Sequence, residues 1–372
     1  MTRGADDHSM TRNENSTRLF SLLSRLMLGA GEHDGPEQIA ASVLQFSRDD
    51  FHQLQDLAST HHVILRAFPR LRRAIADRKN GTNLSRWIDD AIATEQARSD
   101  QALTFLARIC QTLQEAGDVI VIKSLDHWPD LGSDLDLYTN ANSADVSALM
   151  RDRLNARAED PSWGDRLANK WNFAIPGLPE LVEVHVGRLG QTGEQVAITN
   201  SLVARSTILQ FGSHTFRVPA VEEQIVISTL QRMYRHFYLR LCDVADIARR
   251  MNANGIDYVY LRRLAGLSGL WDGLSSYLVI VAEYAESYGG KMLPLPTEVT
   301  CAARLGTADV TFKRKFMRIP IFPQATAFYA KEWTTLLFDG QFRNALRLTL
   351  LPGLATAAAL ASKAVGNDKG IW

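Results

Sequence analysis

Cysteine is scarce in this sequence, and neither sign of charge is in excess. The three cysteines, Cys110, Cys242 and Cys301, lie far apart, with no Cys-x-x-Cys pair and no nearby histidine at ligand spacing. This pattern excludes a disulfide framework and indicates reduced thiols in the cytoplasm. Lysine plus arginine number 41, as do aspartate plus glutamate, so the formal net charge is zero. A chain without an overall basic field is not expected to bind long nucleic acids.

Long apolar runs are also missing. Residues 1–16 are polar and of mixed charge, which predicts a disordered tail and does not match a secretory signal. No run of about 20 apolar residues occurs, so a membrane-spanning helix is not expected. The nearest candidate, residues 348–362, is broken by Pro352 and Gly353. It is typical of a packed helix, and contact of residues 312–365 with a membrane surface is the alternative.

Apolar residues are plentiful, and their spacing divides the chain into three parts. They make up 46% of the 372 residues, enough for a sizeable core. Residues 17–116 have helical spacing almost throughout, which predicts an N-terminal helical domain. Short alternating segments predict a small α/β unit over 117–220, and helical spacing returns over 221–372. The expected fold class is α+β, with a small mixed sheet flanked by N-terminal and C-terminal helical domains.

Several segments of the α/β unit have the composition of short strands. Residues 119–123 read VIVIK, residues 134–138 read DLDLY and residues 181–187 read LVEVHVG. The latter two alternate polar with apolar residues, as half-buried strands do. A further pair of strands is predicted over 206–220, as a hairpin around Gly212. The unit therefore has the strands for a sheet, with helical segments on both sides in the sequence.

Two aspartates lie one residue apart on the second of these strands. Residues two apart on a strand point to the same face, so Asp134 and Asp136 share one face and the leucines share the other. By the same rule Glu183 and His185 share a face of the later strand, and Lys123 ends the first. If the three strands are neighbours, the carboxylates converge and need cations between them. Mg²⁺ is the expected cation, with Mn²⁺ as a substitute, and a pair of such ions forms a phosphate-handling site. The alternative is an edge strand with a solvated charged face.

These motifs resemble the DNA polymerase beta-like nucleotidyltransferase superfamily, and within it the bacterial "uncharacterised nucleotidyltransferase" family. The likeness covers about residues 50–255 and is carried by short motifs. The family has a Lys-Gly strand end, an Asp-x-Asp strand, an acid-x-His strand, and a helical segment with Arg-Leu and Asp-Ile-Ala. The matching residues are Lys123-Ser124, Asp134-Leu135-Asp136, Glu183-Val184-His185, Arg240-Leu241 and Asp246-Ile247-Ala248, with His61 or His62 in the preceding helices.

The resemblance implies a metal-dependent nucleotidyltransferase. Such an enzyme transfers a nucleotidyl group from a nucleoside triphosphate to a hydroxyl of an acceptor, which the sequence does not identify. The likeness makes Asp134, Asp136 and Glu183 the catalytic and metal-binding residues. The residues it implies for nucleotide contacts are Lys123, Ser124, Gly132, Ser133, His185 and Arg240.

One feature of the superfamily is missing from this chain. Ser124 stands where the superfamily has a glycine that lets backbone N–H groups approach the phosphates. Gly132 and Ser133 would then form the tight turn near the nucleotide. Two alternatives therefore stay open: transfer of sugar or phosphate from a nucleotide-activated donor on the same fold, and a non-catalytic binding or assembly protein.

Two basic stretches of the C-terminal part each have two interpretations. Arg232, His236 and Arg240 follow helical spacing, so they form a basic face that clamps phosphates or pairs with aspartates of the next helix. Residues 312–318 read FKRKFMR. This run is typical of a solvated loop, and the alternative is a surface for RNA, a lipid headgroup or a phosphorylated carrier.

Overall fold

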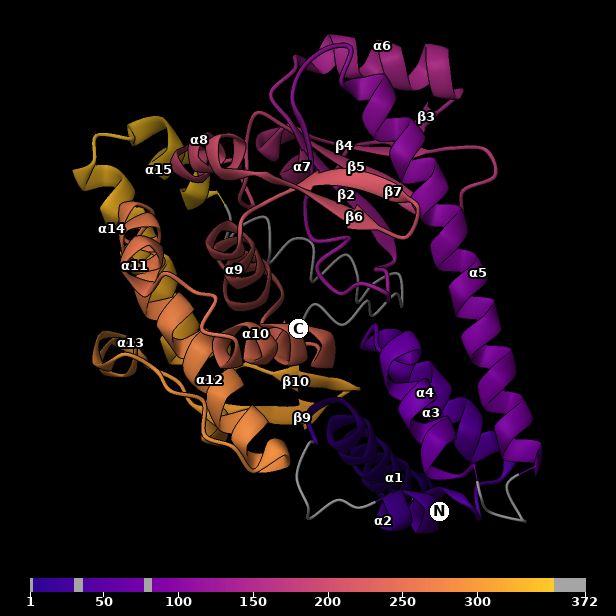
Figure 1. The fold of residues 1–372 in the computed structure, drawn as a ribbon. Coiled ribbons are helices and arrows are strands. Elements are labelled where there is room, and N and C mark those ends of the chain that lie inside the picture. Colours follow the sequence, from indigo (N-terminus) through magenta and orange to yellow (C-terminus); the bar gives the residue numbers. More distant parts are fainter. Residues whose placement is uncertain (1–2, 30–35, 77–81, 351–372) are drawn as a thin grey trace.

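The computed structural model describes residues 3–29, 36–76 and 82–350, which fold into helices around small sheets (Figure 1). This is the mixed α+β class that the sequence predicts. Residues 351–372 lie outside the described residues, and with them most of the apolar segment 348–362.

Helices fill the stretch that precedes the sheet. They are α1 (Arg3–Leu28), α2 (Pro36–Val43), α3 (Arg48–Thr60), α4 (Ile64–Ala74) and α5 (Thr82–Leu113). At the start of α3, the Ser47 hydroxyl accepts a hydrogen bond from the Asp50 N–H, and the Asp50 carboxylate accepts one from the Ser47 N–H. This reciprocal pair satisfies N–H groups that have no partner inside the helix, so the sequence fixes where α3 begins.

The first helix is longer than the sequence predicts. α1 begins at Arg3, so residues 3–16, predicted to be a disordered tail, are helical. Its second half is held by leucines that are buried from Leu19 onward. Extending a helix that is already formed requires no new nucleus, which allows polar residues to continue it.

The long helix α5 connects the N-terminal helices to the sheet. Ile88, in its first half, lies in a core with α1 to α4, whereas Leu106 and Ile109, in its second half, lie in the core beneath the sheet. Figure 1 shows α5 running along one side of the molecule from the N-terminal helices to α6 (Ser143–Leu154). The predicted boundary at residue 116 therefore does not separate two independent packing units.

The predicted strands are neighbours in a five-stranded sheet of order β1-β2-β5-β4-β3. The strands are β1 (Val119–Val121), β2 (Asp134–Thr139), β3 (Arg157–Ala158), β4 (Lys170–Ala174) and β5 (Leu181–Val186). β2 pairs with β1 antiparallel and with β5 parallel, and the register places Asp136 directly beside Glu183. β4 runs antiparallel to β5 on its other side. The sheet is therefore mixed, and β2 and β5 lie within it rather than at an edge.

The two faces of the sheet differ as the alternation predicts. Leu135, Leu137, Val182 and Val184 are fully buried on one face, in a core that α5 and α6 complete. Tyr138, on the other face, belongs to the core of the helices. The short helices α7 (Trp163–Ala168) and α8 (Val196–Arg205) belong to the same part of the chain. The predicted hairpin is confirmed as β6 (Thr207–Phe211) and β7 (His214–Val218).

The C-terminal part is mainly helical. Its helices are α9 (Val221–Thr229), α10 (Leu241–Asn252), α11 (Tyr258–Leu267), α12 (Trp271–Gly289), α13 (Thr297–Ala302), α14 (Thr326–Phe338) and α15 (Phe342–Thr349). Short turns of π- or 3₁₀-helix occupy Leu230–His236, Thr307–Asp309 and Ile321–Ala325. The π-helical turn ends at Phe237, which has φ of 53° and stops the helix before α10 begins.

The basic run 312–318 is part of a sheet, so its prediction as a solvated loop is wrong. β9 (Thr311–Lys313) and β10 (Phe316–Arg318) pair with β8 (Tyr238–Leu239) in the order β8-β10-β9. Met317 is buried, and the ring of Phe316 lies 4.2 Å from that of Tyr238 between centroids. The apolar residues inside the run decide its conformation, because they pack while Arg314 and Lys315 form the turn between the two strands.

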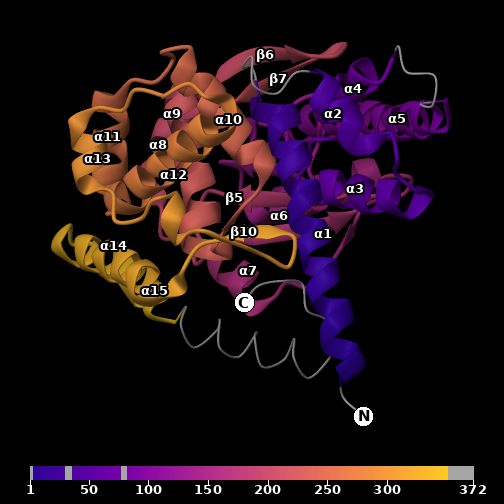
Figure 2. The same cartoon turned by 90° about the horizontal axis from the view of Figure 1, so that it is seen from below.

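The N-terminal and C-terminal helices share one hydrophobic core. Phe20 of α1, Leu54 of α3 and Tyr277 of α12 all belong to it. α1 contacts α3 and α4 on one side and α10 and α12 on the other, and Figure 2 shows it lying between these groups. The two helical domains expected from the sequence are therefore packed into a single body.

Candidate metal and nucleotide site

The polar face of the sheet brings two carboxylates and a histidine together. Asp136 on β2 and Glu183 on β5 are register partners, and His185 follows on the same face of β5. Each of the three offers a ligand atom within 4.8 Å of the others. The side chains of Asp136 and Glu183 are each 13% exposed, so the group is accessible but largely shielded from water. The structure thus places acidic side chains of two separate strands around one point, as the alternation predicts.

Two lysines compensate the negative charge of this group. Lys123, at the end of β1, forms an ion pair with Asp136, and its Nζ lies 3.5 Å from Glu183 Oε1. Lys170 Nζ lies 2.9 Å from Glu183 Oε2 and 2.7 Å from Asp165 Oδ1. In this conformation ammonium groups occupy the positions next to the carboxylates where the sequence alone predicts cations.

The protonation of the group follows from burial and from these neighbours. Burial raises the pKa of Asp136 to about 7, although Lys123 opposes the rise. Burial would also raise the pKa of Glu183, but Lys123, His185 and Lys170 outweigh it and hold that pKa far below its usual range. When two carboxylates are adjacent, ionisation of one raises the pKa of the other. Glu183 has the more cationic surroundings, so it is the one that ionises first.

His185 is a neutral hydrogen-bond partner of Glu183. Burial lowers the pKa of His185 to about 4, so its ring is uncharged at neutral pH. Its Nε2 lies 2.8 Å from Glu183 Oε1, which requires that Nε2 carry the proton and donate it. Within the described residues its Nδ1 is buried without a hydrogen-bond partner. The ring nitrogen that does not face Glu183 is therefore an unprotonated acceptor without a partner among these residues.

Lys123 has an unusual backbone. Its φ of 63° lies in the left-handed region that favours glycine. This conformation comes two residues after β1 ends, and from it Lys123 Nζ reaches the carboxylates. The cost of the conformation is offset by the two ion pairs that the side chain forms.

Ser124 does not have the open donors that the resemblance implies. Its N–H donates to the Ile122 carbonyl at 2.6 Å, and its hydroxyl oxygen accepts the Asp136 N–H at 2.7 Å. The side chain is buried. Ser124 therefore supports the backbone of Asp136, and neither its N–H nor its hydroxyl is directed to a phosphate in this conformation.

Asp134, Gly132 and Ser133 lie at the rim. Asp134 is exposed at the start of β2 and pairs in register with Leu181, one step away from the carboxylate pair. Its carboxylate is not part of the group formed by Asp136, Glu183 and His185. Gly132 turns its carbonyl to Arg98 Nη1, at 3.2 Å, and not to the site. The Ser133 hydroxyl donates to Asp134 Oδ2 at 3.4 Å. The rim therefore offers one exposed carboxylate and a turn fixed to α5.

Lys170 and Asp165 are parts of the site that the sequence analysis missed. They come from β4 and the first turn of α7, a region left without an assignment. The register pairs Lys170 with His185, and Asn172 with Glu183, so the polar residues of β4 face the same side. The alternation of Lys170 and Asn172 with two aromatic residues was a signal of this strand.

The basic helix face predicted from Arg232, His236 and Arg240 does not form. The π-helical turn and the stop at Phe237 place these residues differently. Arg232 Nε lies 2.7 Å from Asp243 Oδ2, and both side chains are at most 3% exposed. The Arg240 side chain contacts His62 and lies near the Tyr238 ring, while its backbone N–H donates to Asp243. Internal pairing therefore applies to Arg232, and Arg240 does not contact the carboxylate pair.

A second group of metal-ligand types lies between α10 and the loop that joins β1 to β2. His127, Cys242 and Asp243 offer ligand atoms within 4.8 Å of one another, so Cys242 has a neighbouring histidine that its sequence spacing did not indicate. However, Asp243 is paired with Arg232, and His127 Nδ1 lies 2.7 Å from Asp246 Oδ2. These charges form a buried network that attaches the loop to α10.

The histidines of the resemblance are also structural. His61 is fully buried; its Nδ1 accepts the Leu241 N–H at 3.0 Å, and its Nε2 lies 2.8 Å from the Lys315 carbonyl. His62 contacts Arg240. Both therefore connect the α3–α4 turn to the C-terminal part rather than to the carboxylates.

Among the helices of the described part of the chain, none has the length and apolar character needed to cross a membrane. α15 exposes Phe342 and Leu346 on one side. Contact of the C-terminal region with a membrane surface stays a prediction. In comparisons with known proteins, no family model, no curated protein and no solved structure matched the chain.

Proposed function

We propose that the protein is a Mg²⁺-dependent nucleotidyltransferase that moves a nucleotidyl group from a nucleoside triphosphate to an acceptor hydroxyl. The observation that supports it is the parallel register of β2 and β5, which sets Asp136 beside Glu183 on a small mixed sheet. This register gives a physical basis to the resemblance in the Asp-x-Asp and acid-x-His motifs.

The donor set suits a divalent cation. Asp136 and Glu183 provide carboxylate oxygens, the ligands that Mg²⁺ prefers, and His185 has a ring nitrogen within 4.8 Å of both. Exposed Asp134 is available on the same strand face for a second ion or for the nucleotide. A bound divalent ion would neutralise phosphate charge and orient the reacting groups.

Lys123 has to leave the carboxylates before a cation can take its place. Its flexible side chain forms the ion pair with Asp136 now and can swing toward a phosphate once the carboxylates hold a metal. In this proposal Glu183 and Asp136 hold the cation, Lys123 binds phosphate, and Lys170 keeps Glu183 ionised and oriented.

Thermal stability measured with Mg²⁺ and each nucleoside triphosphate tests the proposal. A ligand that binds the folded state raises the melting temperature in relation to its concentration and dissociation constant. We expect a shift with at least one triphosphate that requires Mg²⁺ or Mn²⁺ and is lost in Asp136→Asn and in Glu183→Gln. Asp160→Asn is the matched control, because Asp160 is exposed and outside the site. A shift that persists in both site variants would contradict the placement of the metal.

A second candidate function is a non-catalytic nucleotidyltransferase-like binding or assembly protein. It is favoured by Ser124, whose N–H and hydroxyl are both used inside the protein, and by the compensation of the carboxylates by two lysines. Under this alternative no triphosphate shifts the melting temperature with either metal. The same titration therefore separates the two candidates.

A further inference from the structure

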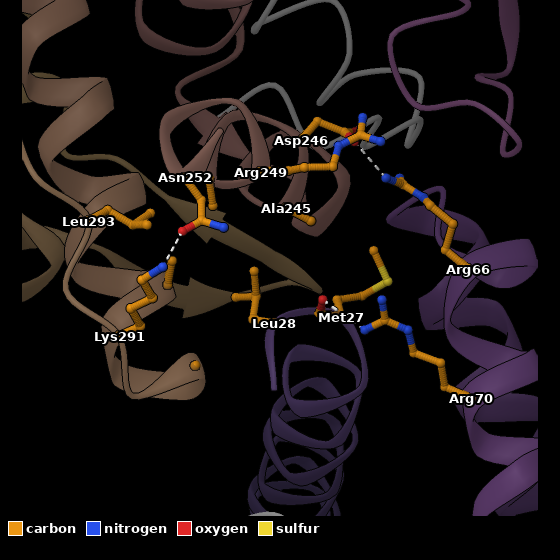
Figure 3. A pocket seen from close by; sticks show the side chains of 13 residues that line it. Met27, Leu28, Arg66, Arg70, Ala245, Asp246, Arg249, Asn252, Lys291 and Leu293 are labelled. Atoms are coloured by element: carbon orange, nitrogen blue, oxygen red, sulfur yellow. Dashed lines mark hydrogen bonds and ion pairs between the residues drawn. The ribbon is translucent and has the colours of Figure 1, made fainter. Parts of the chain in front are cut away.

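A hollow with a cationic lining opens between the end of α1, α4, α10 and the end of α12 (Figure 3). Its volume is about 480 Å³, within the range of small-molecule pockets. Four of its lining side chains are cationic: Arg66, Arg70, Arg249 and Lys291. Of the described residues that line it, Asp246 alone is a carboxylate, and no residue of the carboxylate site takes part.

Asp246 is already fully engaged by other groups. Its Oδ1 lies 2.8 Å from Arg66 Nη1 and 3.1 Å from Arg249 Nη2, and its Oδ2 lies 2.7 Å from His127 Nδ1. Arg66 is compensated further by Asp130, at 2.9 Å. The single carboxylate therefore cannot compensate the other cations of the hollow.

Arg70 and Lys291 are the cations without a carboxylate partner among the described residues. Arg70 Nη1 donates to the backbone carbonyls of Leu26 and Met27 at the end of α1. Burial lowers the pKa of Arg70, and nearby Arg73 and Arg66 add to the effect. Lys291 Nζ donates to Asn252 Oδ1 at 2.6 Å. Figure 3 shows Arg70 and Lys291 on opposite sides of the hollow.

The rest of the lining is apolar. Leu28, Ala245, Ala248 and Leu293 contribute hydrocarbon surface between the cations. A ligand that matches the hollow therefore needs a compact negative group for the cations and an apolar part for these side chains.

We propose that this pocket binds a phosphate monoester with a small apolar group, its phosphate held by Arg70, Lys291 and Arg249. A phosphate dianion supplies more than one negative charge and enough oxygens for donors from three elements. The apolar group lies against Leu28 and Leu293. This goes beyond the proposed nucleotidyl transfer, since the pocket is built from other residues.

Calorimetric titration with hexyl phosphate, inorganic phosphate and hexanol tests this. EDTA is present throughout, so metal-dependent nucleotide binding does not contribute and the two proposals fail independently. We expect hexyl phosphate to bind more tightly than inorganic phosphate, and hexanol to give no measurable binding. Because charged hydrogen bonds are lost, Arg70→Met and Lys291→Met should each weaken hexyl phosphate binding roughly tenfold or more.

Matched controls remove a charge nearby but outside the pocket. Arg73→Met changes a residue on the same helix as Arg70, and Lys313→Met replaces an exposed lysine of β9. Both variants should bind hexyl phosphate with a dissociation constant within about twofold of that of the wild type. Among the described residues the Lys291 side chain donates one hydrogen bond, to Asn252. The Lys291 variant therefore keeps the test valid if Arg70→Met fails to fold. Equal losses in the controls, or no binding of hexyl phosphate to the wild type, would overturn the proposal.

A vesicle experiment identifies the source of the phosphate monoester. Sedimentation with phosphatidic acid vesicles, compared with phosphatidylcholine vesicles, tests whether a lipid headgroup enters the pocket. Co-sedimentation that Lys291→Met abolishes assigns a lipid. Binding of hexyl phosphate without co-sedimentation assigns a soluble ester.

Discussion

At the scale of single residues, the carboxylate site is a balance between like and opposite charges. Asp136 and Glu183 are neighbours by register, and Lys123 and Lys170 lie against them. Removing one partner of a shielded ion pair leaves the other charge without compensation. The stability lost in this way is larger than the stability that the intact pair contributes. The lysines are therefore as important to the site as the acids are.

Replacing Lys123 tests whether ammonium and metal compete for the same carboxylates. Lys123→Met should lower the free energy of unfolding by about 3 kcal/mol in EDTA, because the shielded acids Asp136 and Glu183 then lose a counter-charge. Mn²⁺ should restore more stability in this variant than in the wild type. Urea unfolding with and without Mn²⁺ measures both effects, and Lys313→Met is the control. A variant that Mn²⁺ does not stabilise would show that the acids do not hold a cation.

His61 gives a prediction for pH. Burial lowers its pKa to about 3, and its Nδ1 accepts the Leu241 N–H, so protonation there would remove that bond. The folded state then binds fewer protons than the unfolded state, so the stabilisation present above pH 6.5 is lost as the pH falls. The stability advantage of the wild type over His61→Gln should shrink by about 2 kcal/mol between pH 7 and pH 5.

Urea unfolding of both proteins at the two pH values measures this difference. His52→Gln is the matched control, because His52 is exposed on α3. If the advantage of the wild type is the same at pH 5 and pH 7, His61 does not remain neutral in the folded protein.

At the scale of elements, the joint between α9 and α10 depends on one buried ion pair. The Arg232 side chain extends from the π-helical turn and pairs with Asp243. The Asp243 carboxylate also accepts the Arg240 N–H at the start of α10, and its Oδ1 lies 3.4 Å from His127 Nε2. Burial would raise the pKa of Asp243, but Arg232 and His127 outweigh it and hold that pKa far below its usual range. One carboxylate therefore fixes a helix start, a turn and the loop between β1 and β2.

A double-mutant cycle tests this joint. Asp243→Asn should lower the free energy of unfolding by about 4 kcal/mol, because Arg232 stays buried without its counter-charge. Adding Arg232→Met should recover much of the loss, since neither charge is then buried. Chemical denaturation measures all members of the cycle. Asp152→Asn, at an exposed ion pair, is the control and should have no measurable effect. A double variant no more stable than Asp243→Asn would contradict this explanation.

At the scale of the whole molecule, the helices before and after the sheet act as one body. Leu23 of α1 is fully buried in the core that also contains Tyr277 of α12. α1 lies between the two groups of helices, so its side chains hold both (Figure 2). The stability of the N-terminal helices should therefore depend on the C-terminal ones.

Leu23→Ala tests this shared core. The substitution should lower the free energy of unfolding by about 2 to 5 kcal/mol, because it leaves a cavity between the groups. Native-state hydrogen exchange should show lower protection in both α4 and α12. Leu346→Ala, which removes an exposed leucine of α15, is the control. Loss of protection confined to α1 and its N-terminal neighbours would mean that the two groups unfold separately.

The sheet and its polar face could be predicted because strand geometry has a period of two. Alternation alone placed Asp136 with Asp134, and Glu183 with His185, and β1, β2 and β5 proved to be neighbours. The fate of Ser124, Arg232 and Arg240 could not be predicted this way. Their partners lie 11 or more residues away or depend on a π-helical turn and on loop conformation, which no local period encodes.

The sequence by itself determined the class of the fold, the hairpin around Gly212 and the faces of the two acidic strands, because each follows from spacing within a few residues. Only the tertiary structure decided what compensates the acids, since Lys170 reaches Glu183 through the pairing of β4 with β5. It also decided that the two sets of helices form one core and that a cationic pocket lies between them. Contacts between distant residues depend on packing and on the loss of water around charges, and both are properties of the folded chain.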